Sequence, residues 1–313
     1  MDFERYVAEL ERRRARGGAA GRRGSGNLVV VACTVSTNLL ARTVAVEYER
    51  EGLDLSPMLV LAFEQSGGRG RQGRSWSSPR GLGIYATLAR LYAAPGLLPA
   101  LPLLVGVGLC RALAPHLPQG CRLKWPNDLL VPAAAGEGRG GEGGGGRKGP
   151  RTWRKIGGVL IEALVHPGDG CAALIGFGVN HGQRSEQLPP GATSLVLETG
   201  GHLGGLAAGL GELTWDLVAG VERELDHAGD LAYAVSAYRE LLMHQPGDRL
   251  VCRVGQRQIE GTFAGIDDLG RLRLRQTGAG ERAAAGEAGG LEMEQPREDG
   301  EEVALSAGEV IEP

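Results

Sequence analysis

The pattern of apolar and polar residues alternates along the chain between the period of two that is typical of β-strands and the period of about 3.6 that is typical of α-helices. In one predicted helix, Leu40, Val44 and Tyr48 recur at the helical period, so one stripe is expected to face the core. Ser36 or Thr37 can cap the start of this helix. The predicted strands are residues 27–32, 58–63, 82–90, 121–125, 155–164 and 172–179. The predicted helices are residues 37–50, 103–117 and two segments within 203–243.

This order of elements predicts an α+β fold with a large domain over residues 27–245, in which helices flank a mixed β-sheet. The core is followed by short alternating runs separated by turn signals, which predict a small β-barrel domain over residues 246–313. These runs are residues 248–254, 258–264, 272–275 and 302–311.

Three further segments are not expected to join either domain. Residues 1–26 predict a flexible N-terminal tail that contains a short amphipathic helix around residues 3–14. Residues 133–150 and 277–300 are rich in glycine and carry too little apolar surface to offset their chain entropy. Both are therefore predicted to be disordered insertions.

The composition excludes several classes of protein. With a formal net charge of −3 over 313 residues, the chain has no global attraction to nucleic acid or anionic membranes. The five cysteines form no Cys-x-x-Cys pair, so neither a disulfide framework nor a zinc site is expected, and a reducing cytoplasm fits. No signal peptide is expected. The uncharged residues 93–110 are interrupted by three prolines, so a turn and a buried helix are predicted rather than a membrane span.

One segment is unusually basic for a chain that is acidic overall. No acidic residue lies between Glu64 and Asp128, although that segment holds eight arginines and lysines. Arg69, Arg71 and Arg74 alternate there with glycines directly after a predicted strand. Such a loop can bring backbone N–H groups and guanidinium groups together on an anion. The sequence therefore predicts a local anion-binding loop.

The same loop also fits the spacing Gly-x-Gly-x-x-Gly at Gly68, Gly70 and Gly73, which raises the alternative of a dinucleotide-binding fold. That fold needs a helix directly after the glycines and an acidic residue about 20 positions later. Trp76 and Pro79 follow instead, and no acidic residue appears at that distance. A nicotinamide-dependent enzyme is therefore disfavoured.

Several motifs, in one order, give a resemblance to a known family. The run 68–81, GRGRQGRSWSSPRG, closely resembles the loop of biotin protein ligases, and residues 36–38, 124–129 and 155–162 match further motifs of that family. Residues 176–180 and 192–195 are similar to its later motifs. The resemblance covers about residues 27–313. It implies a core like that of class II aminoacyl-tRNA synthetases and biotin/lipoate ligases, an SH3-like C-terminal domain, and a reaction in which ATP activates biotin for transfer to a lysine of a biotin carboxyl carrier protein.

The resemblance also implies roles for individual residues. The residues expected to be catalytic are Arg69, Arg71, Lys155 and Asp128. The residues expected to bind biotin are Ser36, Thr37, Asn38, Gln65, Gly68, Arg69, Gly70, Arg71, Lys155, Gly157 and Gly158. The residues expected to bind ATP are Arg71, Arg74, Trp76, Lys124, Asn127 and Asn180.

Elementary electrostatics explains why such a reaction needs cations. A carboxylate must approach a phosphate, and two unit charges at about 4 Å repel by roughly 4 kcal/mol at an effective dielectric constant near 20. Arg69, Arg71, Arg74 and Lys155 are the candidates to offset this repulsion. Asp128 can accept a proton from the attacking lysine or serve as a structural cap.

Several of these residues also have a structural interpretation. Ser36 can be only a helix cap and Asn180 only a turn residue, while Gly157 and Gly158 can mark a strand bulge rather than a close approach to ligand. Trp76 can cover the pocket or pack in the core, and core packing is the better interpretation. No metal site is expected, because His181 has no clustered partner, and magnesium is expected through the phosphates of ATP.

The sequence also departs from the family pattern and leaves rivals open. Residues between Leu130 and Lys155 form a Gly-rich insertion, which is expected to loop away from the site. Residues before Asn27 are too few for a winged helix, so a monofunctional ligase without DNA binding is predicted, and a homodimer is compatible with the fold. The Gly/Arg loop, residues 67–74, is expected to be a mobile lid. The alternatives are a lipoate or octanoate ligase or transferase of the same fold and a non-enzymatic biotin-binding module.

Overall fold

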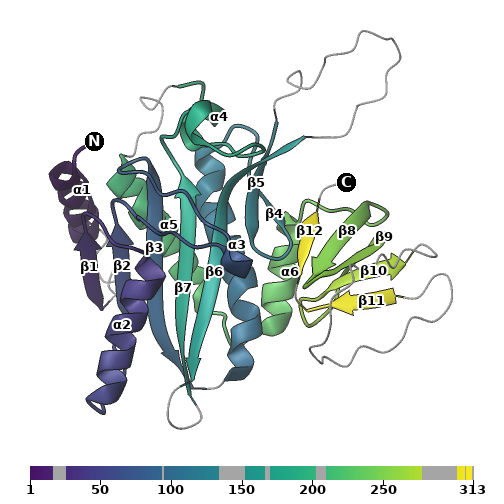
Figure 1. Cartoon of the computed structure of the whole chain (residues 1–313), viewed down its shortest axis with the longest axis horizontal. Coiled ribbons are helices and arrows are strands. Elements are labelled where there is room, and N and C mark those ends of the chain that lie inside the picture. Colours follow the sequence, from purple (N-terminus) through teal and green to yellow (C-terminus); the bar gives the residue numbers. More distant parts are fainter. Residues whose placement is uncertain are drawn as a thin grey trace.

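Two β-sheets form the framework of the chain (Figure 1). The computed structural model describes residues 1–16, 26–93, 95–133, 152–165, 170–201, 209–276, 302–306 and 308–311. The predicted insertions 133–150 and 277–300 lie outside these residues, apart from Ala133. The larger sheet has seven strands and the smaller has five, which confirms the mixed α+β core with a separate antiparallel C-terminal sheet.

The larger sheet has the order β1-β2-β3-β7-β6-β5-β4. Strands β1 and β2 are parallel, and every other neighbouring pair is antiparallel. The strands are β1 (Asn27–Val31), β2 (Met58–Ala62), β3 (Gly83–Tyr92), β4 (Arg122–Lys124), β5 (Asp128–Pro132), β6 (Trp153–Val165) and β7 (Cys171–Asn180). Strand β5 was not among the predicted strands, because its short apolar run lies beside the glycine-rich insertion and continues the polar turn of a hairpin.

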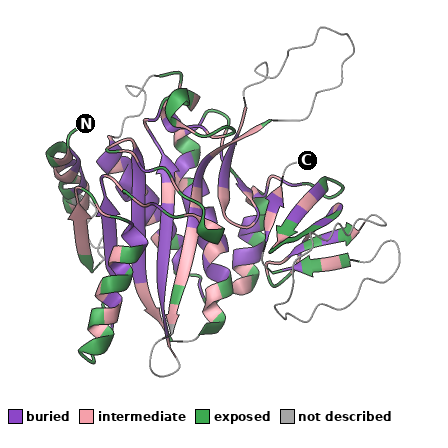
Figure 2. Ribbon diagram, in the orientation of Figure 1, coloured by how far each residue is buried: buried purple, intermediate pink, exposed green. Residues whose placement is uncertain are grey.

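Alternating side chains bury both faces of this sheet. Leu59 and Leu61 belong to one hydrophobic cluster, whereas Met58 and Val60 belong to another on the opposite face. Helix α2 (Thr37–Arg50) covers the second cluster with the predicted stripe of Leu40, Val44 and Tyr48. Strands β2, β3 and β7 are buried almost throughout, whereas β6 is mostly half-buried, as Figure 2 shows.

The first cluster is covered by several helices: α1 (Phe3–Arg16), α3 (Leu101–Leu113), α5 (Leu210–Leu225) and α6 (Leu231–Leu241). Helix α3 is apolar on all sides and is the central core helix, as predicted, although segment Pro95–His116 is long and apolar enough to cross a membrane. It approaches α5 closely, and this approach requires glycine at residue 108, because a Cβ at Gly108 would lie only 2.7 Å from the carbonyl oxygen of Gly220.

The prediction of a flexible N-terminal tail is wrong for residues 3–16. Helix α1 packs along α5, and its residues Tyr6 and Leu10 are fully buried. The Tyr6 ring lies 5.4 Å from the ring of Phe63, and Arg13 forms an ion pair of 2.5 Å with Asp216 of α5. Phe3, Tyr6 and Leu10 lie three or four residues apart, so one face of the predicted helix had enough apolar surface to dock. Residues 17–25 lie outside the described part of the chain.

The smaller sheet follows α6 and has the order β11-β10-β9-β8-β12. Its strands are β8 (Arg249–Val254), β9 (Arg257–Ile266), β10 (Leu272–Gln276), β11 (Glu302–Leu305) and β12 (Glu309–Ile311). All neighbouring pairs are antiparallel. Its buried residues, among them Cys252, Phe263 and Leu274, join the same hydrophobic cluster as α3 and α6, so the two sheets share one continuous core.

Candidate active site

A cavity of about 360 Å³ opens where the ends of β2, β5, β6 and β7 meet the Gly/Arg loop and strand β12. Most of the predicted site residues line it, although they come from segments far apart in the sequence. These residues are Ser36, Thr37, Asn38, Gln65, Arg69, Gly70, Arg71, Arg74, Trp76, Lys124, Asn127, Asp128, Lys155, Gly158 and Asn180. The two predicted residues outside the lining are Gly68 and Gly157.

Those two glycines shape the frame of the cavity instead. A Cβ at Gly68 would lie 2.4 Å from the carbonyl oxygen of Trp76, and one at Gly157 would lie 2.8 Å from that of Gly178. Any side chain at either position would force the backbone apart. A register shift between β5 and β6 also lies beside Gly157, in agreement with the alternative that glycines here mark a bulge.

One end of the cavity carries a buried network of uncharged polar groups. Oε1 of Gln65 accepts a hydrogen bond of 2.8 Å from the backbone N–H of Thr37, and Nε2 of Gln65 donates one of 2.8 Å to Ser78. The Thr87 hydroxyl donates to Oδ1 of Asn38 over 2.6 Å. Each amide is thereby held in one orientation, and Nδ2 of Asn38 also donates to the Glu162 carboxylate over 2.7 Å. Glu162 does not line the cavity, so the lining at this end presents fixed donors and acceptors rather than charges.

Ser36 lies at the mouth of this network as the residue before α2. Its hydroxyl does not cap the helix, which excludes the capping role among the sequence alternatives. Although the residue is only 3% exposed, its hydroxyl has no hydrogen-bond partner among the described residues. Because Ser36 lines the cavity, this hydroxyl is available to bond a ligand there.

The Gly/Arg loop folds into a tight hairpin at the other end of the cavity. The N–H of Gly70 donates to the Arg74 carbonyl over 2.7 Å, and the N–H of Trp76 donates to the Gly68 carbonyl over 2.9 Å. At the hairpin tip, Gln72 has a φ of 57° and Gly73 one of 74°. This left-handed backbone is strained for glutamine and natural for glycine.

The hairpin directs three arginines towards or beside the cavity. Arg71 donates hydrogen bonds of 3.3 Å to Oδ1 of Asn127 and to the Gly308 carbonyl, while Arg74 forms an ion pair of 2.6 Å with Glu309. Arg69 lines the cavity without an ionic partner among the described residues. The pKa of Arg71 is lowered mainly by burial, and the carboxylate of Asp128 partly offsets this effect.

Lys155 begins the chemistry-bearing part of β6. Its Nζ donates a hydrogen bond of 2.6 Å to Oδ1 of Asp128 and lies 5.6 Å from the centre of the Trp76 ring. Trp76 therefore lines the cavity rather than packing in the core, which corrects the interpretation preferred from sequence. The indole fits there because residue 178 is glycine: a Cβ at Gly178 would lie 2.6 Å from Nε1 of Trp76.

The turn between β4 and β5 carries Asn127 and Asp128. Nδ2 of Asn127 donates to the Val159 carbonyl over 2.8 Å, and the N–H of Val159 donates to the Asn127 carbonyl over 2.9 Å. Asn127 is thus fixed against β6, with Oδ1 facing Arg71. Lys124 precedes the turn and also lines the cavity.

Asn180, at the end of β7, lines the cavity but has both ends of its amide engaged. Nδ2 donates to the Thr193 carbonyl over 2.9 Å, and Oδ1 accepts from Gln183 over 3.2 Å. These bonds support the structural alternative for this residue. Its contact with ATP stays a prediction.

Sequence reasoning missed several residues of the site. Thr87 and Ser78 orient the neutral network, and Gly308 closes the cavity from the side of the smaller sheet together with Glu309 and Val310 of β12. Nothing local in the sequence distinguishes these residues. Only the spacing Gly176-x-Gly178 gave a signal, since alternate residues of a strand share a face and glycines there leave room for Asn38 and Trp76.

Within the described residues, no group of three or more His, Cys, Asp or Glu side chains could hold a metal ion. His181 is nearly buried, and burial, followed by repulsion from His116, lowers its pKa to about 4. The carboxylates of Asp128 and Glu309 line the cavity, but each is paired with a cation.

Comparison with known proteins extends these observations. A profile of the biotin/lipoate A/B protein ligase family matches residues 32–180. The chain is 30% identical to the biotin--[acetyl-CoA-carboxylase] ligase of Mycobacterium tuberculosis, covering 87% of this chain and 92% of that protein. It is 31% identical to the enzyme of the same name from Paracoccus denitrificans, covering 76% of this chain and 93% of the relative.

The fold has a counterpart among solved structures. The biotin protein ligase of Aquifex aeolicus, solved in complex with biotin and ATP, superposes with a TM-score of 0.60 at 21% identity, covering 91% of this chain and 97% of that one. The same two-sheet arrangement is therefore present in both chains. With these relatives and with the motifs gathered around one cavity, the chain belongs to the biotin protein ligase family of enzymes.

Proposed function

We propose that this chain joins biotin to the AMP part of ATP and then transfers the biotinyl group to a lysine of a carrier protein. The proposal depends on one observation: a single cavity has a neutral, hydrogen-bonding end at Ser36 and Gln65 and a cationic end at Lys155 and the loop arginines. The names of the Mycobacterium and Paracoccus relatives support it.

In the first step, a carboxylate oxygen of biotin forms a bond to the α-phosphorus of ATP, and the bond to the departing pyrophosphate breaks. The approach of two anions is unfavourable, so fixed positive charges are required. Lys155 would stabilise charge at the reacting centre, while Arg69, Arg71 and Arg74 would bind phosphate oxygens. The five cations of the cavity lining, against two carboxylates, support these roles.

The neutral end would hold the ring of biotin, which is polar but uncharged. The hydroxyl of Ser36 has an open bond there, whereas Thr37, Asn38 and Gln65 are oriented by the network around Thr87 and Ser78. Gly70 and Gly158 would let backbone approach the ligand. At the other end, Lys124, Asn127, Asn180 and Trp76 would surround the nucleotide.

In the second step, the amine of a carrier lysine forms a bond to the carbonyl carbon of the adenylate, AMP leaves, and the amine loses a proton. Asp128 is our candidate to accept this proton. Oδ1 of Asp128 already accepts a hydrogen bond from Lys155. The carboxylate would therefore orient Lys155 through Oδ1 and take the proton of the carrier lysine through its second oxygen.

Magnesium is expected to enter with ATP. The described carboxylates form no three-ligand cluster, and Mg²⁺ commonly binds through substrate phosphates with few protein ligands. The ion would neutralise phosphate charge, while the side chains of the cavity bind and orient the reactants.

The remaining expectations stay proposals. The acceptor would be a biotin carboxyl carrier protein, the compartment a reducing cytoplasm in keeping with five free cysteines, and DNA would not be a partner. A homodimer could form through the edge strand β1 of the larger sheet. Closure of the Gly/Arg loop over ligand would protect the adenylate from water.

The deciding experiment combines the protein with labelled biotin, ATP, magnesium and a carrier domain, and measures label on the carrier lysine. Transfer is expected with the natural carrier domain and not with one whose acceptor lysine is replaced by arginine. Biotin-dependent exchange of pyrophosphate into ATP separates an enzyme from a binding module. Competition by lipoate separates the two ligase classes, since lipoate should not displace biotin.

A further inference from the structure

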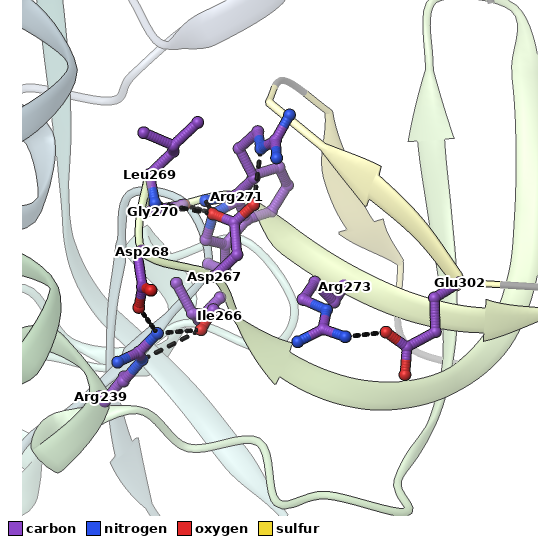
Figure 3. Close-up of polar contacts among 10 residues, drawn as sticks. Arg239, Ile266, Asp267, Asp268, Leu269, Gly270, Arg271, Arg273 and Glu302 are labelled. Carbon is purple, nitrogen blue, oxygen red and sulfur yellow. Dashed lines mark hydrogen bonds and ion pairs between the residues drawn. The ribbon is translucent and has the colours of Figure 1, made fainter. Parts of the chain in front are cut away.

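The second domain touches the site through the turn between β9 and β10, at a place apart from β12. The Asp267 carboxylate shapes this turn: Oδ1 accepts hydrogen bonds from the N–H groups of Leu269 and Arg271 over 3.0 and 2.9 Å, and Oδ2 accepts one of 2.6 Å from Nε of Arg271 (Figure 3). An aspartate that bonds the backbone two residues later stabilises a tight turn. The turn is therefore built by one side chain.

The apex of the turn is pressed against the first domain. Gly270 has a φ of 78°, and a Cβ on it would lie 2.8 Å from Cδ1 of Leu103 at the start of α3. From α6, Arg239 donates hydrogen bonds of 3.0 and 2.6 Å to the Ile266 carbonyl and lies 2.9 Å from the Asp268 carboxylate (Figure 3). The turn thus contacts the first sheet's helices on both sides, and the positive φ at its apex favours glycine.

The carbonyl at this apex contacts the catalytic turn, residues 124–128, which connects β4 to β5. Nε1 of Trp125 donates a hydrogen bond of 3.1 Å to the Gly270 oxygen, and the Trp125 side chain, only 3% exposed, also lines the cavity. Trp125 lies between Lys124 and the two residues proposed to act on the substrates, Asn127 and Asp128. A buried indole N–H without an acceptor is unfavourable, so this bond fixes the ring and the backbone that carries it.

Residues 124–128 continue from one edge of the larger sheet. Strand β4, which leads into it, has only three residues and is the edge strand of its sheet. On the outer edge of β4, the N–H of Met243 donates a hydrogen bond of 2.9 Å to the Leu123 carbonyl. A short edge strand frays readily, so an anchor beyond its end has a large influence on the position of the turn.

We infer that Asp267 and Gly270 are positioning residues for the ligase reaction: the turn they form directs a backbone carbonyl at Trp125 and thereby holds residues 124–128 in place for ATP. The second domain would then act on the nucleotide site through a main-chain atom, without a side chain that touches the substrate. This inference rests on the proposed function, because it assigns ATP to the end of the cavity that contains Asn127.

The test compares Asp267→Ala with Asp267→Asn and with Arg273→Ala. Asparagine keeps the Oδ1 acceptor for Leu269 and Arg271, whereas alanine removes it. Arg273 is the matched control, because it pairs with Glu302 within the same sheet and away from the turn, as Figure 3 shows. Biotin-dependent pyrophosphate exchange gives KM for ATP, KM for biotin and kcat for each variant.

Without Asp267 the turn should no longer hold the Gly270 carbonyl against Nε1 of Trp125. Loss of this one neutral hydrogen bond is expected to raise KM for ATP about tenfold in Asp267→Ala and to change KM for biotin less than about twofold. KM for ATP of Asp267→Asn should stay within about threefold of that of the unaltered chain, and KM for ATP of Arg273→Ala should equal that of the unaltered chain. Equal effects of Asp267→Ala and Arg273→Ala on KM for ATP, or equal changes in both KM values, would overturn the inference.

Amide hydrogen exchange supplies a second readout that does not depend on catalysis. Amides of residues 122–128 should exchange faster in Asp267→Ala and in Gly270→Ala than in Arg273→Ala, while those of β6 and β7 stay unchanged. Unaltered exchange in residues 122–128 would contradict the positioning role even if the enzyme is active. If the unaltered chain lacked pyrophosphate exchange, the proposed function would fail, and the amide measurement alone would decide whether the turn positions these residues.

Discussion

The ammonium group of Lys155 lies 2.6 Å from Oδ1 of Asp128, across the junction between the first residues of β6 and the start of β5. The two side chains are 35% and 23% exposed, so the pair faces the cavity and contributes little to folding. Its position at the cationic end of the cavity points to a role in chemistry rather than in stability.

Replacing this lysine should separate activity from folding. Lys155→Met keeps most of the side-chain length but removes the charge, so formation of the adenylate is expected to fall by about 100-fold or more. The free energy of unfolding should change by less than about 1 kcal/mol, because the ion pair is solvated. Pyrophosphate exchange and urea unfolding measure the two quantities. A comparable loss in both would mean that the lysine is mainly structural.

The role of Asp128 can be tested one step later. Asp128→Asn retains an acceptor for Lys155 but is a far weaker proton acceptor, so transfer from preformed biotinyl-AMP to the carrier is expected to slow about 100-fold. Adenylate formation should be affected less. Single-turnover transfer, measured against pH, is the appropriate experiment. Equal slowing of both steps would favour the purely orienting role.

Arg74 offers a test of phosphate binding. Removing its guanidinium in Arg74→Ala should raise KM for ATP about tenfold or more, the range for a hydrogen bond to a charged group. KM for biotin should be nearly constant. Arg80→Ala is the control, because Arg80 pairs with Glu64 at 3.4 Å and does not line the cavity. If both variants raised KM for ATP alike, general electrostatic attraction would account for the effect.

Ser36 should affect biotin affinity without affecting stability. Its hydroxyl has no partner among the described residues and does not cap α2, so Ser36→Ala is expected to weaken biotin binding about three- to tenfold at unchanged melting temperature. Ser194 is the matched contrast, since its hydroxyl accepts a hydrogen bond from Leu197, caps helix α4 (Leu195–Glu198) and donates to the Gln183 carbonyl over 2.6 Å. Ser194→Ala should lower stability by about 1 kcal/mol. Calorimetry of binding and unfolding distinguishes the two serines.

Burial of His181 predicts a specific acid sensitivity. Its pKa is about 4 in the folded chain and 6.5 without the fold, so the unfolded state binds more protons between these values. Stability is complete above about pH 6.5 and should decline by up to about 3 kcal/mol as the pH falls towards 4. His181→Gln should remove this part of the slope, whereas His227→Gln, at an exposed position, should leave it. Chemical denaturation at several pH values gives the answer.

Local sequence determined much of the fold. Helix α2 has the predicted bounds and stripe, because its apolar residues recur at the helical period and need no distant partner to define them. Strand β5 was missed, since a run of five residues beside an insertion has no periodicity of its own. The tail prediction failed at α1 for a related reason: whether an amphipathic helix docks depends on an apolar surface elsewhere, here Phe63 and α5.

The sequence by itself determined which chemistry is available: the Gly/Arg loop, the lysine of β6 and the amides and hydroxyls expected to surround biotin and ATP. Tertiary structure alone decided how these groups are used. It directed Trp76 onto Gly178, released Ser36 from capping, paired Lys155 with Asp128, and brought β12 and the Asp267 turn to the cavity. Residue type fixes charge and hydrogen-bonding capacity locally, whereas the partner of each group depends on contacts between segments that are apart in the sequence, from 27 residues for Lys155 and Asp128 to 145 for Trp125 and Gly270.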